Sequence, residues 1–160
     1  MKLTGSLKKF TVAATLCTAT LLAGVAGNAG TGERSVANQE NRVLKIRIDV
    51  QGSAVLVTLN DSPSARDFAA LLPLTVKLED YGGIEKIAYL PRKLSTRDAP
   101  AGVTPVTGDF AYYAPWGNLA LFHGSFQHSP GLVRLGRIDA GIEALRRPGE
   151  VKARISVLED

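Results

Sequence analysis

Apolar and polar residues alternate along two stretches of the chain, and this two-residue period constrains the fold more than any other feature. Even-numbered positions are aliphatic in residues 44–50, and odd-numbered positions are apolar in residues 151–157. Side chains of a β-strand point to opposite faces in turn, so each stretch predicts a strand with one buried face. Further short strands are expected between them, with a hairpin turn at Gln51-Gly52. We therefore predict a mainly β fold, a closed β-barrel in which residues 151–158 pair with the strand that starts near Leu44.

Two short helices are expected among these strands. Asp61 or Ser62 can accept hydrogen bonds from the free backbone amides of a first helix, and the proline that follows suits its first turn. Phe68 and Leu71 fall on the apolar stripe of this helix, so we expect them to matter for stability only. A second short helix is predicted directly after Asp139, which would cap it.

The first 29 residues have the pattern of an export signal. Basic residues precede an uncharged run, "FTVAATLCTATLLA", and small residues suited to a signal peptidase follow it. This run is shorter than the roughly 20 apolar residues of a membrane-spanning helix. We predict a signal peptide over residues 1–29 with cleavage after Ala26 or Ala29, a flexible linker over residues 30–43, and one domain over residues 44–160. Cys17 leaves with the signal, so the predicted mature chain has no cysteine.

The positive charge of the chain is largely a targeting charge. The sequence has 19 basic and 15 acidic residues, a net charge of +4. Three lysines, but no acidic residue, precede the predicted cleavage sites, so 16 basic residues and a net charge of +1 remain. We therefore expect no nucleic-acid partner, and no stable membrane anchor after signal removal. The mature protein is expected to be exported, either periplasmic or secreted.

Segments at both ends of the predicted domain resemble cyclophilins. Residues 59–68, "LNDSPSARDF", are similar to the early strand-to-helix segment of that family, and residues 133–138, "VRLGRI", to its late strand-turn-helix segment. Between them, "LEDYGGIEKIAYLPRKL" and "GDFAYYAPWGNLALFH" are similar to stretches of a smaller group of bacterial cyclophilin-like proteins of unassigned function. The resemblance implies a cyclophilin-like barrel over residues 44–158, and it implies no particular activity.

The residues that carry prolyl isomerase activity in cyclophilins do not match. The family places a catalytic arginine after a Phe-His pair that precedes its Gly-Asp-Phe segment. Here Phe122-His123 follows residues 108–110, Gly124 stands where the arginine would, and Leu132 falls at a late histidine position. Without the arginine the electrostatic part of catalysis is missing. We favour a non-catalytic binding module. The alternatives are a peptidyl-prolyl isomerase with a displaced or weakened site, and a small hydrolase or lyase on the same barrel.

The aromatic residues concentrate around a Pro-Trp-Gly turn, where half of them lie within residues 112–126. Strand alternation is expected to bury some of these rings in the core, Tyr112 or Phe122 first. Trp116 lies in a turn, where side chains are presented to solvent on a rigid scaffold. The candidate site, for an unknown small molecule or peptide, consists of Tyr113, Trp116, Asn118, Phe122 and His123.

Other chemistry has less support in the sequence. His123 and His128 are the only histidines, and the segment between them has no carboxylate to complete a three-ligand zinc site. No G-x-S-x-G nucleophile motif accompanies a Ser-His-Asp set. The basic residues of the last strands are interpreted as solvated faces. No metal or cofactor is predicted, and no catalytic residue is assigned.

Overall fold

A computed structural model describes residues 43–158 of the chain. The predicted signal peptide, its cleavage sites and nearly all of the linker lie outside the described residues. Within residues 43–158, no helix is long and apolar enough to cross a membrane. The elements in chain order are β1 (Lys45–Val50), β2 (Ser53–Leu59), α1 (Pro63–Ala69), β3 (Leu74–Tyr81), β4 (Glu85–Tyr89), β5 (Gly102–Val103), β6 (Asp109–Tyr113), β7 (Asn118–Phe122), β8 (Ser129–Pro130), β9 (Leu132–Ala140), the 3-10 helix η1 (Ile142–Arg146) and β10 (Val151–Val157).

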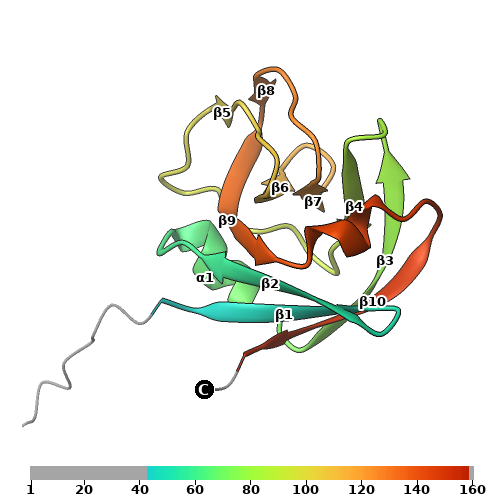
Figure 1. Cartoon of the computed structure of the whole chain (residues 1–160). Helices are drawn as coiled ribbons and strands as arrows, with labels where there is room; N and C mark the ends of the chain where they lie inside the picture. Colours follow the sequence, from blue (N-terminus) through green and yellow to red (C-terminus); the bar gives the residue numbers. More distant parts are fainter. Residues whose placement is uncertain (1–42, 159–160) are drawn as a thin grey trace, which may run out of the picture. The chain divides into compact units, whose positions relative to one another are not determined.

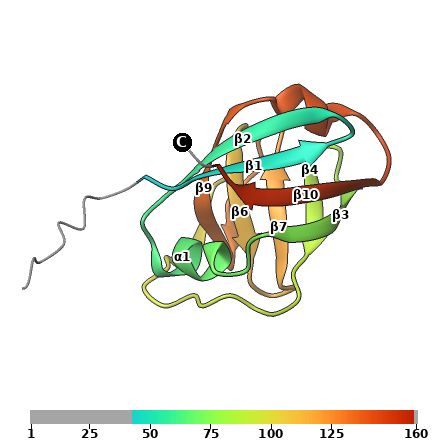
Figure 2. The same cartoon turned by 90° about the horizontal axis from the view of Figure 1, so that it is seen from below.

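The long strands form a closed antiparallel barrel in the order β1-β10-β3-β4-β7-β6-β9-β2 (Figures 1 and 2). The register of β1 and β10 runs from Ile46 opposite Val157 to Val50 opposite Ala153. The predicted barrel, and its closure by the two terminal strands, are therefore confirmed. The short strands β5 and β8 pair only with each other, within the long connections on either side of β6 and β7.

The hairpin of β1 and β2 has the predicted two-residue turn. Gln51 and Gly52 both have positive φ, 47° and 79°. Two such residues turn the chain with the same twist as the flanking strands, so Val50 and Ser53 remain paired.

Helix α1 begins and packs as the sequence predicts. Ser62 is the N-cap, and its hydroxyl oxygen accepts a hydrogen bond of 3.1 Å from the N–H of Ala65. Phe68 is fully buried, and its ring meets that of Phe110 edge-on with 5.3 Å between the ring centroids. The two views place α1 and η1 at opposite ends of the barrel (Figures 1 and 2).

The second expected helix is a single 3-10 segment, η1, and Asp139 does not cap it. Gly141 is the N-cap, with a φ of 81° and no capping side chain. Strand β9 remains paired with β2 as far as Ala140, which keeps Asp139 in extended backbone. The Asp139 carboxylate instead accepts a hydrogen bond of 2.6 Å from the Thr58 hydroxyl. The predicted cap was wrong because long-range strand pairing outcompetes the local capping preference.

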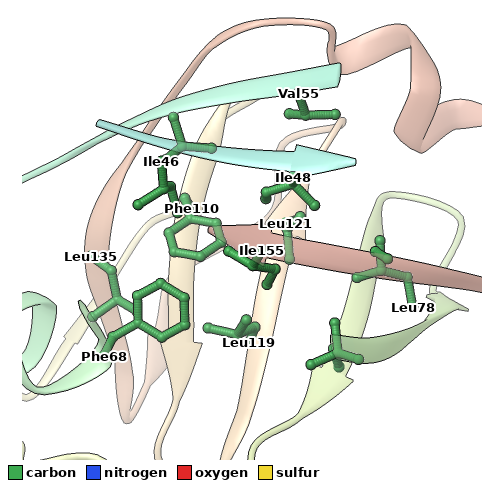
Figure 3. Close-up of a cluster of buried hydrophobic side chains, with 14 of the residues drawn as sticks. Ile46, Ile48, Val55, Phe68, Leu78, Phe110, Leu119, Leu121, Leu135 and Ile155 are labelled. Carbon is green, nitrogen blue, oxygen red and sulfur yellow. The ribbon is translucent and has the colours of Figure 1, made fainter. Parts of the chain in front are cut away.

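The barrel interior is filled by side chains from the strands and α1. Tyr112 is wholly buried there, and its hydroxyl oxygen accepts a hydrogen bond from the N–H of Leu94, which attaches the long loop after β4 to the barrel. Figure 3 labels ten of the buried core residues: Ile46, Ile48, Val55, Phe68, Leu78, Phe110, Leu119, Leu121, Leu135 and Ile155.

Candidate ligand-binding site

The outer face of the barrel carries a second apolar cluster over β6, β7 and the start of β9. The inward positions of β7 are occupied by Leu119 and Leu121, which belong to the core. Because strand side chains alternate, Asn118, Ala120 and Phe122 point outward. Ala120 and Phe122 pack there with Ala111 and Leu132, all almost completely buried although they lie outside the barrel interior.

A pocket of about 200 Å³ lies on this outer face. Four of the five predicted site residues, Tyr113, Trp116, Asn118 and Phe122, are in its walls. The complete lining is Tyr81, Glu85, Ile87, Tyr113, Trp116, Asn118, Ala120, Phe122, Phe126, Ser129 and Leu132.

Three aromatic rings form a row beside the pocket. The centroid of the Trp116 ring lies 5.5 Å from that of Tyr81 and 5.4 Å from that of Tyr113, and both contacts are edge-to-face. Tyr81 belongs to β3 and Tyr113 to β6, and β4 and β7 lie between these two strands. The row therefore extends across the outer surface of β4 and β7, and the residues Ile87 and Ala120 of these strands form the floor of the pocket.

The turn between β6 and β7 positions the indole. The N–H of Gly117 donates to the carbonyl of Tyr113 at 2.9 Å, and Gly117 has a φ of 77°, which favours glycine. Trp116 at the tip of this turn keeps 47% of its surface exposed. Its side chain is therefore a rim of the pocket and not a part of the core.

Glu85 is a carboxyl group in the pocket wall. It is only 9% exposed, and it has no hydrogen-bond or ion-pair partner among residues 43–158. Desolvation by burial raises the pKa of Glu85 to about 7. At neutral pH this group is therefore poised between its protonated and ionised forms, and a bound molecule can select either one.

Asn118 supplies a second unpaired polar group. Its side-chain nitrogen donates to the carbonyl oxygen of Leu119 at 2.9 Å, which orients the amide. The Oδ1 atom is buried and has no hydrogen-bond partner within the described part of the chain. A buried acceptor without a donor is costly, about 1–3 kcal/mol, and a ligand donor would relieve that cost.

His123, the fifth predicted site residue, does not line this pocket. It directly follows Phe122, and its backbone N–H donates to the carbonyl of Ile84 at 2.9 Å. Burial, followed by the charges of Arg146 and Lys86, lowers the pKa of His123. Its part in a site stays a prediction.

Lys86 and Asp80 belong to a different environment from Glu85. Lys86 is 1% exposed, and its ammonium group contacts the Asp80 carboxylate at 2.5 Å and the Gly149 carbonyl oxygen at 2.7 Å. The two residues are paired across β3 and β4, one position out of phase with the pair Tyr81 and Glu85. Lys86 therefore faces the barrel interior, and its charge is already matched there.

The arginines of β9 also have a structural partner. Asp109 is 1% exposed and forms ion pairs with Arg134 at 2.8 Å and with Arg137 at 3.1 Å. Barrel strands β1 and β2 separate β9 from β10, whose Lys152 and Arg154 are exposed. In the described residues, no group of three or more His, Cys, Asp or Glu side chains is placed to hold a metal ion.

Sequence reasoning missed Glu85 and Tyr81. The available signal was the phase of "EKIAY", because Glu85 and Ile87 share one face of β4. A carboxylate in phase with a buried isoleucine indicates a charged group on an apolar surface.

The family comparison agrees with this architecture. Residues 48–156 match the model of the Cyclophilin-like family, and the chain belongs to that family. The fold is also similar to the solution structure of a hypothetical protein from Archaeoglobus fulgidus, with a TM-score of 0.53 and 20% identity over 78% of this chain and 98% of that one. At that identity the likeness concerns the fold alone. No functionally curated protein matches the sequence significantly.

Proposed function

We propose that this protein is an exported cyclophilin-like binding module whose ligand, a small molecule or a peptide, occupies the outer-face pocket. The observation that carries the proposal is a nearly buried carboxyl group, Glu85, and a buried amide oxygen without a donor, on Asn118, beside an aromatic row in which Trp116 and Tyr81 are half exposed. Ligand sites are typically concave and mostly apolar, with a few polar groups that fix the orientation of the ligand. Among residues 43–158, carboxylates with low exposure such as those of Asp109 and Asp67 form ion pairs, which distinguishes them from Glu85.

The test uses the single tryptophan as the reporter. In a screen of small apolar molecules and short peptides, we expect compounds that shift Trp116 emission. Calorimetry of Trp116→Ala should then show loss of their binding. Because Trp116 is half exposed, the same substitution should lower the free energy of unfolding by only about 1 kcal/mol or less.

A matched control is Tyr89→Ala, which removes an exposed ring that is not in the pocket wall. This variant should bind the same compounds as the unmodified protein. Retained binding in Trp116→Ala, or global unfolding of that variant, would contradict the assignment of the pocket.

We expect little or no prolyl isomerase activity. Isomerisation must overcome a barrier of about 18–20 kcal/mol, and a cationic donor assists by stabilising developing charge. Among the described residues that line the pocket, none is arginine, lysine or histidine. A protease-independent exchange assay on Ala-Pro peptides measures this activity. An acceleration comparable to that of an ordinary cyclophilin, lost in Trp116→Ala, would favour the alternative of an isomerase with a displaced site.

The export part of the proposal rests on the N-terminal sequence pattern. The mature chain is expected to begin at Gly27 or Gly30, and intact-mass measurement of protein recovered outside the cytoplasm of an exporting host gives the cleavage site. Recovery of only the full-length, membrane-bound or acylated form would refute soluble export.

A further inference from the structure

We propose that the outer-face pocket recognises an ammonium group carried on a compact apolar body, with the Glu85 carboxylate as its counter-ion. The inference rests on the proposed binding function and specifies the class of ligand. Its basis is the placement of an unpartnered, nearly buried carboxyl group in the same walls as three aromatic rings.

Residues 43–158 supply no cation to Glu85. On the same strand, Lys86 points to the opposite face, where Asp80 and the Gly149 carbonyl oxygen satisfy it. The pocket walls contain no basic side chain among the described residues. An ammonium ligand would pair with the ionised carboxylate and compensate its desolvation, which a neutral ligand cannot do.

The aromatic row favours the same class of ligand. Cations are attracted to the electron-rich faces of Trp and Tyr rings, and the attraction is larger where water is excluded. The ring of Trp116 is nearly perpendicular to those of Tyr81 and Tyr113, at 88° and 80°, so the rings of the row differ in orientation. Ile87 and Ala120 offer an apolar floor for the body of the ligand.

The size of the pocket limits that body. A cavity of about 150 Å³ holds one benzene molecule, and this pocket of about 200 Å³ has room for a ring with a short ammonium-bearing arm.

The second unpaired acceptor lies toward the other end of the floor. Glu85 is paired with Phe122 and Tyr89 with Asn118, so the two positions are four residues apart along β7. At about 3.3 Å per residue this is about 13 Å between backbone positions. A single ammonium group is not expected to serve both acceptors. We infer a second donor, a hydroxyl or an amide N–H, at the far end of the ligand.

Tyramine has an ammonium group at one end of a ring and a hydroxyl at the other, and it is the probe. Tyrosol, 4-hydroxyphenylethanol, is its matched control, because a neutral hydroxyl replaces the ammonium and the rest is unchanged. Calorimetric titration of the full chain at pH 8 should give a Kd for tyramine at least about tenfold lower than that for tyrosol, as expected for a hydrogen bond to a charged group.

The pH dependence separates charge from shape. Besides Glu85, the titratable groups of the walls are the phenols of Tyr81 and Tyr113, while Lys86, Asp80 and His123 lie on or next to the same strands. Burial raises the pKa of Glu85 to about 7. Tyramine must displace that proton, so its affinity should rise between pH 5 and pH 8 by up to about tenfold per pH unit, whereas the affinity for neutral tyrosol should show no such rise.

The decisive variant is Glu85→Gln, which keeps the size of the side chain and removes its charge. It should weaken tyramine binding at pH 8 at least about tenfold, and it should not weaken tyrosol binding, because a neutral ligand gains no ion pair with the carboxylate. Glu150→Gln, the same change at an exposed carboxylate outside the pocket, should alter neither affinity.

The outcomes distinguish the two proposals. Equal binding of tyramine and tyrosol, or unchanged tyramine binding by Glu85→Gln, overturns the ammonium inference and leaves the binding function standing. The inference is likewise wrong if tyramine fails to bind up to about 10 mM while a neutral compound binds in a Trp116-dependent manner. If no compound binds in that manner, both proposals fail.

Discussion

Replacing Phe68 with alanine should lower the free energy of unfolding by about 3–5 kcal/mol. The ring is 0% exposed and packs edge-on against Phe110 in the core (Figure 3). Its truncation removes apolar contacts and leaves a cavity that the surrounding strands cannot fill, because they are fixed by barrel pairing. Urea unfolding followed by circular dichroism gives the change. Leu71 packs against the core from a partly buried position, so its truncation should lower the free energy of unfolding by less.

Phe126→Ala is the control for this prediction. This substitution also removes a phenyl ring, but from the pocket wall, where Phe126 is 51% exposed. We expect a loss of about 1 kcal/mol or less there, with a defect in ligand binding instead. Equal destabilisation by the two substitutions would mean that the outer-face aromatics belong to the folding core, contrary to the site proposed here.

Glu85→Gln should make the protein more stable than the unmodified chain at pH 8 and nearly equal to it below pH 4.5. Burial raises the pKa of Glu85 from 4.5 to about 7 in the folded state. The folded protein therefore holds a proton that the unfolded chain releases, and its stability falls as the pH rises from about 4.5 to about 7. At about 1.4 kcal/mol per pKa unit, the difference between the variants should reach about 3 kcal/mol at pH 8.

Thermal unfolding of the unmodified protein and of Glu85→Gln across pH 4–8 measures this effect. The difference in Tm between the two proteins should reach about 10 °C. Other groups titrate as well: hydrogen bonds from Arg92 and from Lys86 lower the pKa of Asp67 and of Asp80, respectively, and burial lowers that of His123. These contributions are common to both proteins and cancel in the difference. Parallel pH profiles for the two proteins would show that Glu85 is solvated or paired in solution.

A destabilising ionised Glu85 gives the ligand hypothesis a thermodynamic basis. The ionised carboxylate lowers the stability of the folded protein while the pocket is unoccupied. A bound counter-ion can offset this desolvation penalty. Tyramine should therefore raise the Tm of the unmodified protein more at pH 8 than at pH 5, because only the folded state offers the site.

Much of the fold could be predicted from the sequence, because its signals are local. Alternation identified β1 and β10, the Gln51-Gly52 pair identified the hairpin turn, and the residues before Pro63 identified the start of α1. Each of these depends on backbone preferences and on which side of a strand or helix is apolar. The aromatic concentration around Trp116 likewise indicated a candidate site, and four of its five proposed residues line one pocket.

The tertiary structure alone decided which strand faces form the barrel interior and which side chains from distant strands contact each residue. Glu85 and Tyr81 join Trp116 only because β3, β4, β7 and β6 are neighbours in the barrel, an order that does not follow the sequence. The same long-range pairing holds Asp139 in β9. It also brings Asp109 into ion pairs with Arg134 and Arg137. Local sequence determines that a strand forms and which residues share its face. The core, the outer pocket and the buried carboxyl group arise only when distant strands pair, since burial and desolvation depend on neighbours far away in the chain.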